Sequence, residues 1–324
     1  MAKVKNFKTI FPAVSVPLND DYSINESEFR AYLRWIKTFY GKGMDGLVCN
    51  GHTGEITGLT RAERKRVVEI CAEECGDVMT IISGVNCENT AESIEMAKEA
   101  KEAGADGILL MPPHMWLRFG MNPDAPFEYA KDVAEGADID IIIHLYPATS
   151  KAFYPVETLI KMCKEIDHVK CIKMGTRVTS IYEHDVRLLR QECPDISLIT
   201  CHDETLCVSW FPGMDGALIG FAGCVPEIIC PAREVFANPD KHTLKEAQDW
   251  SDRIYHISQA IYGGGQPSGE AHARLKEALK QRGIFKSALM RKPVLPLNDE
   301  EKAWVALGLE RSQLPEVDMT QFED

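Results

Sequence analysis

The chain of 324 residues lacks any uninterrupted apolar run close to the roughly 18 residues that a membrane-spanning helix requires. It is also short of positive charge, since 36 lysines and arginines face 49 acidic residues and the net charge is −13. Nucleic acids and anionic membranes both bind basic surfaces, so we expect neither as a partner. The N-terminus has no apolar segment of the signal-peptide type, which favours a cytoplasmic protein.

Cysteine spacings typical of a disulfide framework are absent, although the chain has eleven cysteines. Most lie inside apolar stretches, as Cys49, Cys171 and Cys201 do, so we expect reduced and buried side chains. Cys71 and Cys75 lie one helical turn apart, but no second pair of ligands follows them. The sequence therefore predicts no metal site.

No G-x-G-x-x-G sequence follows the first expected strand, which counts against a dinucleotide-binding open sheet. Short apolar runs instead alternate with amphipathic helical segments. Each run is nearly continuously apolar, as in a parallel sheet covered on both faces, and together they predict eight strands: 9–18, 46–51, 79–85, 107–113, 140–147, 169–175, 197–203 and 216–224. Eight such units predict an α/β fold, a (β/α)8 TIM barrel over residues 1–235 that carries the active site.

The helical segments carry start and stop signals. Asn25 precedes Glu28 at the spacing of a capping box, and Gly104 is a stop signal for the helix expected in the segment 90–106. A further helix is expected over 60–75. Beyond residue 235 no strand-like run remains and three more helical segments follow, which predict a C-terminal helical extension over 236–324 packed on the barrel.

Two lysines interrupt the apolar run at 169–175. Because side chains alternate along a strand, Lys170 shares a face with Ile172 and lies near the strand's start, where it can reach solvent at the bottom rim. Lys173 lies near the strand's end, where the active site of such a barrel is built. A lysine there is either a rim residue paired with an acid or a desolvated amine that forms a Schiff base with a carbonyl.

Two further features distinguish between these readings of Lys173. Tyr146 ends the preceding strand, so it should neighbour Lys173 and could relay protons in Schiff-base chemistry, although a rim tyrosine in water is the alternative. The segment NGHTGE at 50–55 follows the second strand. Its glycines permit tight turns and a close approach of N–H groups to an anion, such as the carboxylate of a 2-oxo acid. Together these features favour the Schiff-base reading.

In this order and spacing, these residues resemble the dihydrodipicolinate synthase/N-acetylneuraminate lyase family, as a divergent subgroup. The GHTGE segment matches its G-x-x-G-E loop, Tyr146 its strand-five tyrosine and Lys173 its Schiff-base lysine. Gly220 lies in GALIGFAGC, which occupies the place of the family's glycine-rich eighth strand. The resemblance covers roughly residues 7–235 and implies the chemistry of a class I aldolase, with no metal and no organic cofactor.

The resemblance also implies roles. Lys173 forms an imine with pyruvate or another 2-oxo acid, and Tyr146 moves protons. Thr53, with the loop at Gly51 and Gly54, orients the carboxylate of that substrate. The family further implies a homotetramer built as a dimer of dimers.

The chain departs from the synthases of this family at several positions. His52 stands where they have a threonine, His114 is the nearest match to a tyrosine of their proton relay, and Lys151 stands where they have an arginine for the second substrate's carboxylate. The residues expected to form the imine are thus retained, whereas those expected to bind the second substrate differ from the synthases. We expect His52, His114, Lys151 and His202 to recognise the rest of the substrate.

His202 and Asp203 end the seventh strand, and alternation places them on opposite faces, so only one of them should face the site. A rim histidine is the other reading of His202. His144 is expected in the core below Tyr146. An apolar segment after the fourth strand, with Trp116 at its centre, favours a subunit interface over a lid.

We therefore expect a lyase or aldolase that acts on pyruvate or a related 2-oxo acid through the Lys173 imine. A dehydratase or a hydratase-aldolase on the same imine is the alternative, with a deoxy-oxo sugar acid or a benzylidenepyruvate-like substrate. An authentic 4-hydroxy-tetrahydrodipicolinate synthase is less favoured. From another class, a non-catalytic barrel that binds a 2-oxo acid for regulation also stays open, although such a binder needs neither Lys173 nor Tyr146.

Overall fold

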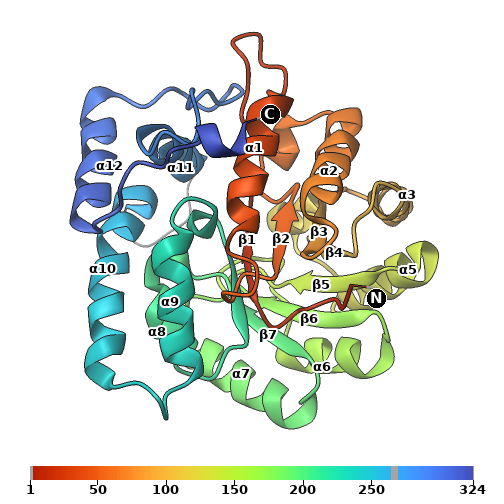
Figure 1. The fold of residues 1–324 in the computed structure, drawn as a ribbon. Helices are drawn as coiled ribbons and strands as arrows, with labels where there is room; N and C mark the ends of the chain where they lie inside the picture. Colours follow the sequence, from red (N-terminus) through yellow and green to blue (C-terminus); the bar gives the residue numbers. More distant parts are fainter. Residues whose placement is uncertain (1–2, 264–268, 324) are drawn as a thin grey trace.

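A single sheet of eight parallel strands forms the centre of the computed structural model, which describes residues 3–263 and 269–323 (Figure 1). The strands follow the order β1-β8-β7-β6-β5-β4-β3-β2, as expected for a TIM barrel. Their bounds are β1 Ile10–Pro12, β2 Gly46–Cys49, β3 Thr80–Val85, β4 Gly107–Leu110, β5 Asp140–His144, β6 Val169–Met174, β7 Ser197–Thr200 and β8 Gly216–Ile219. The predicted (β/α)8 fold is confirmed.

The barrel is nearly closed at the seam between β1 and β2. Beyond β1, the N–H of Ala13 donates to the carbonyl of Ile219 in β8, and the N–H of Val14 donates to that of Val48 in β2. A single bridge pairs Ala13 with Val48. The predicted first strand, 9–18, is much shorter in the structure. The N–H groups of Ile10 and Val14 face the β2 side, so Pro12 between them, which has no N–H to donate, interrupts regular pairing on that side.

Helices surround the strands, and one follows nearly every strand (Figure 1). The helices of the barrel are α1 Glu26–Lys37, α2 Arg61–Cys75, α3 Thr90–Glu102, α4 His114–Phe119, α5 Ala125–Ala137, α6 Val156–Glu165, α7 Thr179–Glu192, α8 Leu206–Trp210 and α9 Pro226–Ala237. Three short 3-10 turns follow strands at the C-terminal end of the barrel: η1 Ile56–Gly58, η2 Asp203–Thr205 and η3 Phe221–Gly223.

The predicted helix signals are found where the sequence placed them. The side chain of Asn25 accepts from the N–H of Glu28 and caps α1. Thr60 caps α2 through a capping box with Glu63. Gly104 follows α3 with a φ of +103°, a left-handed conformation that glycine adopts at little cost.

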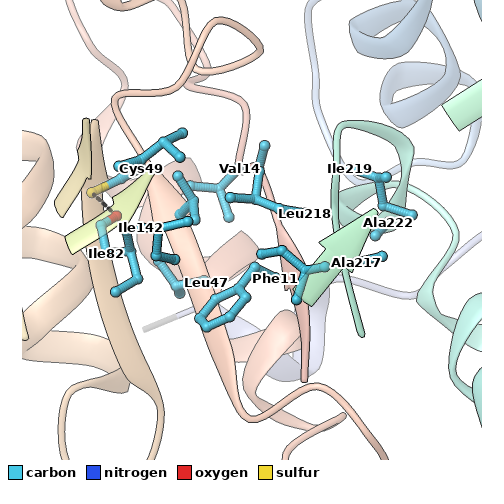
Figure 2. Packing of buried hydrophobic residues seen from close by; sticks show 14 of the residues in the cluster. Phe11, Val14, Leu47, Cys49, Ile82, Ile142, Ala217, Leu218, Ile219 and Ala222 are labelled. Carbon is cyan, nitrogen blue, oxygen red and sulfur yellow. Dashed lines mark hydrogen bonds between the residues drawn. The ribbon is translucent and has the colours of Figure 1, made fainter. Parts of the chain in front are cut away.

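Apolar side chains fill the inside of the barrel. Figure 2 shows residues of β1, β2, β3, β5 and β8 gathered in one cluster, in which Phe11, Leu47 and Ile142 have no exposed surface. A Cβ added to Gly46 would lie only 2.4 Å from the ring of Phe11, so the phenylalanine packs where a side chain on β2 is missing. The barrel is therefore a packed core, and polar chemistry is confined to its ends.

The C-terminal part of the chain is helical and lies against one flank of the barrel (Figure 1). It contains α10 Leu244–Tyr262, α11 Gly269–Gln281, α12 Asp299–Arg311 and the final turn η4 Thr320–Phe322. Arg282 ties this part to the barrel, since its guanidinium donates to the carboxylate of Glu227 at 2.8 Å. A C-terminal helical extension is thus present, as the sequence predicted.

A second ion pair joins the extension to the loop that follows β2. Lys276 of α11, whose side chain is 1% exposed, pairs with the carboxylate of Glu55 and donates to the carbonyl of Leu289 at 2.9 Å. Glu55 itself has a left-handed φ of +57°. The GHTGE segment is therefore held in place by a helix that follows it by more than 200 residues in the chain.

Removal of Lys276 should destabilise the protein far more than removal of an exposed lysine. Lys276→Met leaves the Glu55 carboxylate buried without its cation, which costs about 3 to 5 kcal/mol in the free energy of unfolding. Lys276→Met combined with Glu55→Gln should recover part of this loss, and Lys280→Met, at an exposed position of the same helix, should have little effect. Urea denaturation measures all three. A loss below about 1 kcal/mol for Lys276→Met, as for a surface pair, would contradict the assignment.

Candidate active site at the mouth of the barrel

Lys173 and Lys170 lie at opposite ends of β6. Lys170 is exposed, and its ammonium donates to the carbonyl of Asp167 at 2.6 Å, at the end of the barrel where β6 begins. Lys173 is half-buried near the other end, in register with His144 of β5 and Ile199 of β7. The strand thus sends one lysine to solvent and holds the other at the mouth of the barrel, the end formed by the C-terminal ends of the strands.

The protonation of Lys173 is set mainly by its burial. Loss of hydration disfavours the ammonium and lowers the pKa of Lys173, and the positive charge of Arg177 adds to this effect. Cys201 and Asp203 act in the opposite direction, because negative charge nearby favours the ammonium. A lysine with a lowered pKa has a larger fraction of free amine near neutral pH, and the free amine is the form that attacks a carbonyl.

Tyr146 lies in the loop that follows β5, two residues beyond the strand's end rather than within it. The N–H of Leu145 donates to the carbonyl of Lys173 at 3.1 Å, so this loop runs beside the end of β6. A Cβ on Gly175 would lie 1.9 Å from the carbonyl oxygen of Leu145, and only glycine permits this approach. The two segments that carry Tyr146 and Lys173 are thereby held together.

The loop that follows β2 brings His52 to Tyr146. The tyrosine hydroxyl and the Nε2 atom of His52 share a hydrogen bond of 3.1 Å. The ring of His144 is 4.9 Å from the Tyr146 ring and 5.6 Å from the His52 ring, between centroids. Burial raises the pKa of Tyr146, which keeps its hydroxyl protonated and able to donate.

His52 is a neutral imidazole in this setting. Burial, followed by the charge of Lys173, lowers the pKa of His52 to about 3. Weaker contributions come from His114 and from His272 of the C-terminal helix α11. The charge of Lys173 lowers the pKa of His52, and His52 is hydrogen-bonded to Tyr146. The three side chains therefore form one interacting group.

The backbone of the GHTGE loop bends at residues other than those that the sequence suggested. Asn50 and Glu55 have left-handed φ values of +52° and +57°, whereas Gly51 and Gly54 do not lie in that region. Gly54 is instead required by crowding, since an added Cβ would lie 3.0 Å from the carbonyl oxygen of Val14. The main-chain N–H groups of Thr53 and Gly54 find no acceptor in the described part of the chain, which leaves them available to an anion.

Gly220, directly after β8, brings the eighth strand close to this loop. A Cβ at Gly220 would lie 2.9 Å from the hydroxyl oxygen of Thr53 and 2.5 Å from that of Tyr262. Thr53 and Tyr262 therefore approach the same point of the backbone, one from the loop after β2 and the other from helix α10. A side chain at position 220 would displace one of them.

Two residues assigned to substrate recognition have more peripheral positions. His114 begins α4, and its ring stacks at 6.5 Å from that of His52, with its Nδ1 3.7 Å from the Glu88 carboxylate. Lys151 is exposed, and its ammonium donates to the carbonyl of Arg118 near the end of α4. The structure thus brings His114 to the edge of the group around Lys173, whereas Lys151 is engaged with α4.

His202 does not join this group, although it was assigned to substrate binding. Its ring lies 4.7 Å from that of Tyr182 in α7, and it lines a cavity of about 560 Å³ between α7 and α8. Its neighbour Asp203, the first residue of η2, lies on the other side, where the carboxylate interacts with Tyr262 and with the charge of Lys173. Of the two residues between which the sequence left a choice, Asp203 is the one that faces the mouth.

Tyr262 and His272 were missed by the sequence analysis. Both belong to the C-terminal helices, and burial lowers the pKa of His272 to about 4. In the sequence they are one aromatic and one imidazole on amphipathic helices, a pattern that also fits ordinary packing. Only the docking of α10 and α11 on the barrel brings them to the site.

Comparison with known proteins places the chain in a family. Residues 6–311 match the sequence profile of the dihydrodipicolinate synthetase family. The chain belongs to this family. It is accordingly an enzyme, a lyase of the class I aldolase type.

Among curated relatives in this family, a 4-hydroxy-tetrahydrodipicolinate synthase from Bartonella bacilliformis is 26% identical over 309 residues, which covers 95% of this chain and 98% of that protein. An uncharacterised DapA-like lyase from Thermofilum pendens is 25% identical over 292 residues, with coverages of 90% and 92%.

Two solved structures show the same fold. Dihydrodipicolinate synthase from Aquifex aeolicus superposes with a TM-score of 0.83 at 19% identity, covering 96% of this chain and 100% of that chain. YagE from E. coli K12, a prophage protein of the dihydrodipicolinic acid synthase family solved in complex with pyruvate, gives 0.84 at 21% identity, with coverages of 95% and 99%.

Neither a metal centre nor a membrane span is found in the parts of this family member that the structure describes. Residues 3–263 and 269–323 contain no group of three or more histidine, cysteine or acidic side chains arranged to hold a metal ion. Over the same residues, no helix is long and apolar enough to cross a bilayer.

His52 should stay neutral throughout the ordinary range of pH. Because burial and the charge of Lys173 both disfavour its cation, the His52 signal in a nitrogen-15 NMR titration should keep the shifts of a neutral imidazole from pH 8 down to pH 5. The signal is assigned by its loss in His52→Thr. A midpoint for this signal near 6.5, the ordinary value for histidine, would contradict the site described above.

Proposed function

We propose that the protein is a Schiff-base-forming aldolase that acts on pyruvate or a related 2-oxo acid through Lys173. The observation that carries this proposal is the half-buried Lys173 at the mouth of the barrel, whose pKa is lowered by loss of hydration and which lies next to the hydrogen-bonded pair of Tyr146 and His52. A desolvated amine beside a protonated hydroxyl is the arrangement that imine formation requires. The family, and the pyruvate in the complex of YagE, favour the same substrate.

The reaction begins when the free amine of Lys173 attacks the carbonyl carbon of the 2-oxo acid. The carbonyl oxygen takes up protons and leaves as water, so that a C=N bond replaces C=O. The protonated imine then accepts the electron pair released when a C–H or C–C bond at the adjacent carbon breaks. In the condensing direction, the resulting enamine carbon attacks an aldehyde, and hydrolysis of the imine releases the product and Lys173.

Tyr146 is the proposed carrier of protons to and from the departing oxygen. Its hydroxyl stays protonated because burial raises its pKa. His52 stays neutral, so its Nε2 atom can hold the tyrosine hydroxyl in one orientation without adding positive charge beside Lys173. Since the synthases have a threonine where this chain has His52, the hydrogen-bonded pair of Tyr146 and His52 is one of its departures from them.

The carboxylate of the substrate is assigned to the loop after β2. Thr53 contributes a hydroxyl, and the N–H groups of Thr53 and Gly54 are free to donate in the described chain. Gly51 lies in this loop, and Gly220 leaves room beside the Thr53 hydroxyl. The pair of Glu55 and Lys276 fixes this loop from behind.

The second substrate is proposed to differ from that of the synthases. Relatives named 4-hydroxy-tetrahydrodipicolinate synthase are only 26% identical to this chain. The resemblance assigns an arginine to bind a carboxylate at position 151, and here Lys151 donates to the carbonyl of Arg118. A lysine engaged in this way cannot bind a carboxylate at two points as an arginine does, so the site favours an aldehyde that lacks a carboxylate there.

A homotetramer, built as a dimer of dimers, is the proposed assembly. Exposed apolar side chains support two separate contacts. On α4, Met115 is 49% and Phe119 is 76% exposed, and at the end of α8, Val208 and Phe211 are 61% and 65% exposed. Patches of this kind on a soluble chain mark surfaces that bind other chains.

Reductive trapping tests the nucleophile. Incubation with pyruvate and borohydride should add the mass of one reduced pyruvate to Lys173, located by peptide mass spectrometry. Lys170→Ala should leave this adduct unchanged, since Lys170 lies at the other end of the strand. No adduct at Lys173 with pyruvate or with a panel of 2-oxo acids would refute the proposal, and an adduct without any turnover would favour a binding protein.

Substitution of Tyr146 should separate imine formation from turnover. In Tyr146→Phe the adduct with Lys173 still forms, but slowly, and turnover falls by roughly 100- to 10,000-fold, which is the usual contribution of a positioned proton donor. Turnover is measured by the release of pyruvate and an aldehyde from candidate aldols. Loss of water without any carbon fragment would identify a dehydratase instead. Unchanged turnover in Tyr146→Phe would remove this residue from the mechanism.

A further inference from the structure

The C-terminal helix α10 reaches the active site with its last residue. Tyr262 is 4% exposed and shares a hydrogen bond with the carboxylate of Asp203. One turn earlier on the same face, the hydroxyl of Ser258 donates to the main-chain carbonyl of Asp203 at 2.8 Å. Two residues of α10 therefore hold the first residue of η2, the turn that follows β7, through its side chain and through its backbone.

Asp203 is a buried carboxylate with few partners. Besides Tyr262, its Oδ1 atom accepts from the N–H of Phe221 at 3.3 Å. The neighbouring acid, Glu204, is turned away and paired with Arg177, whose Nε lies 2.7 Å from its Oε1. Asp203 is thus the carboxylate of this pair whose charge is left to act on Lys173.

We propose that Tyr262 is a positioning residue of the active site, contributed by the extension: with Ser258 it fixes the Asp203 carboxylate beside Lys173, and that carboxylate sets the pH range in which the Lys173 amine is reactive. The proposal rests on the function proposed above for Lys173. It assigns to the C-terminal helices a part in the chemistry in addition to their part in packing.

The groups that face these residues come from several elements. Lys173 is surrounded by His52 and His144, whose pKa values burial lowers so that both are neutral, and by Cys201, Asp203 and Arg177. Of these, Asp203 and Cys201 favour the ammonium, and Arg177 opposes it.

Asp203 in turn responds to its own surroundings. Burial raises the pKa of Asp203 to about 6, with a smaller contribution from Glu204, whereas the hydrogen bond from Tyr262 and the charge of Lys173 lower it. Loss of the Tyr262 hydroxyl therefore lets Asp203 keep its proton to higher pH. A protonated Asp203 no longer favours the ammonium of Lys173.

The test measures the reactivity of the Lys173 amine itself, without any substrate. The intact protein is labelled with trace acetic anhydride at a series of pH values, and the acetylation of Lys173 is followed by mass spectrometry with Lys170 as an internal standard. In Asp203→Asn the midpoint for Lys173 should move to lower pH by roughly one unit or more, since a nearby opposite charge is lost. In Tyr262→Phe it should move in the same direction by less.

Matched controls distinguish a role of Tyr262 in positioning Asp203 from a role in packing α10 on the barrel. Tyr255→Phe, at an exposed tyrosine of the same helix, should leave the midpoint unchanged. Tyr262→Phe keeps the ring in place, so thermal unfolding of this variant should stay close to that of the native protein. A midpoint for Lys173 that is the same in the native protein, Asp203→Asn and Tyr262→Phe overturns this inference, even where pyruvate still forms its adduct. Absence of that adduct, with the midpoints shifted as expected, overturns the proposed substrate alone.

Discussion

The burial of one amine at the mouth of a nearly closed barrel is the constraint on which the active site depends. An ammonium loses hydration when it enters a packed barrel, and Lys173 is compensated only in part, by Cys201 and Asp203, with Arg177 acting against them. The surrounding imidazoles add no charge, because burial and Lys173 itself keep His52 and His144 neutral. The site thereby holds a nucleophile that loses its proton more easily than an ordinary lysine.

The extension acts on the site from two directions. Lys276 of α11 holds Glu55 behind the loop that carries Thr53, and Tyr262 of α10 holds Asp203 on the opposite side of the mouth. Both links are buried, so water does not screen them as it does surface ion pairs. Without these helices, the loop after β2 and the turn η2 after β7 would lose these supports.

Much of the fold followed from the sequence, because the periodicity of apolar residues is a local property. The eight strands, the capped helices and the helical C-terminal part were all expected, and the alternation of Lys170 and Lys173 separated the two lysines correctly. The first strand is shorter than predicted, since Pro12 has no N–H to pair on the side of β2. The bends of the GHTGE loop lie at Asn50 and Glu55 rather than at its glycines, and Gly54 is instead crowded by the backbone of Val14.

The sequence by itself determined the barrel, the strand end that carries Lys173 and the loop that follows β2, since spacing along the chain is enough to place a residue at the end of a strand. Which groups surround the Lys173 amine is seen only in the tertiary structure. In the structure Asp203, and not His202, lies near the amine, and Lys151 donates to a carbonyl near the end of α4. Tyr262 and His272 reach the site from helices far along the chain. These contacts depend on how helices dock on the barrel, and docking is governed by packing between distant segments, which no local pattern records.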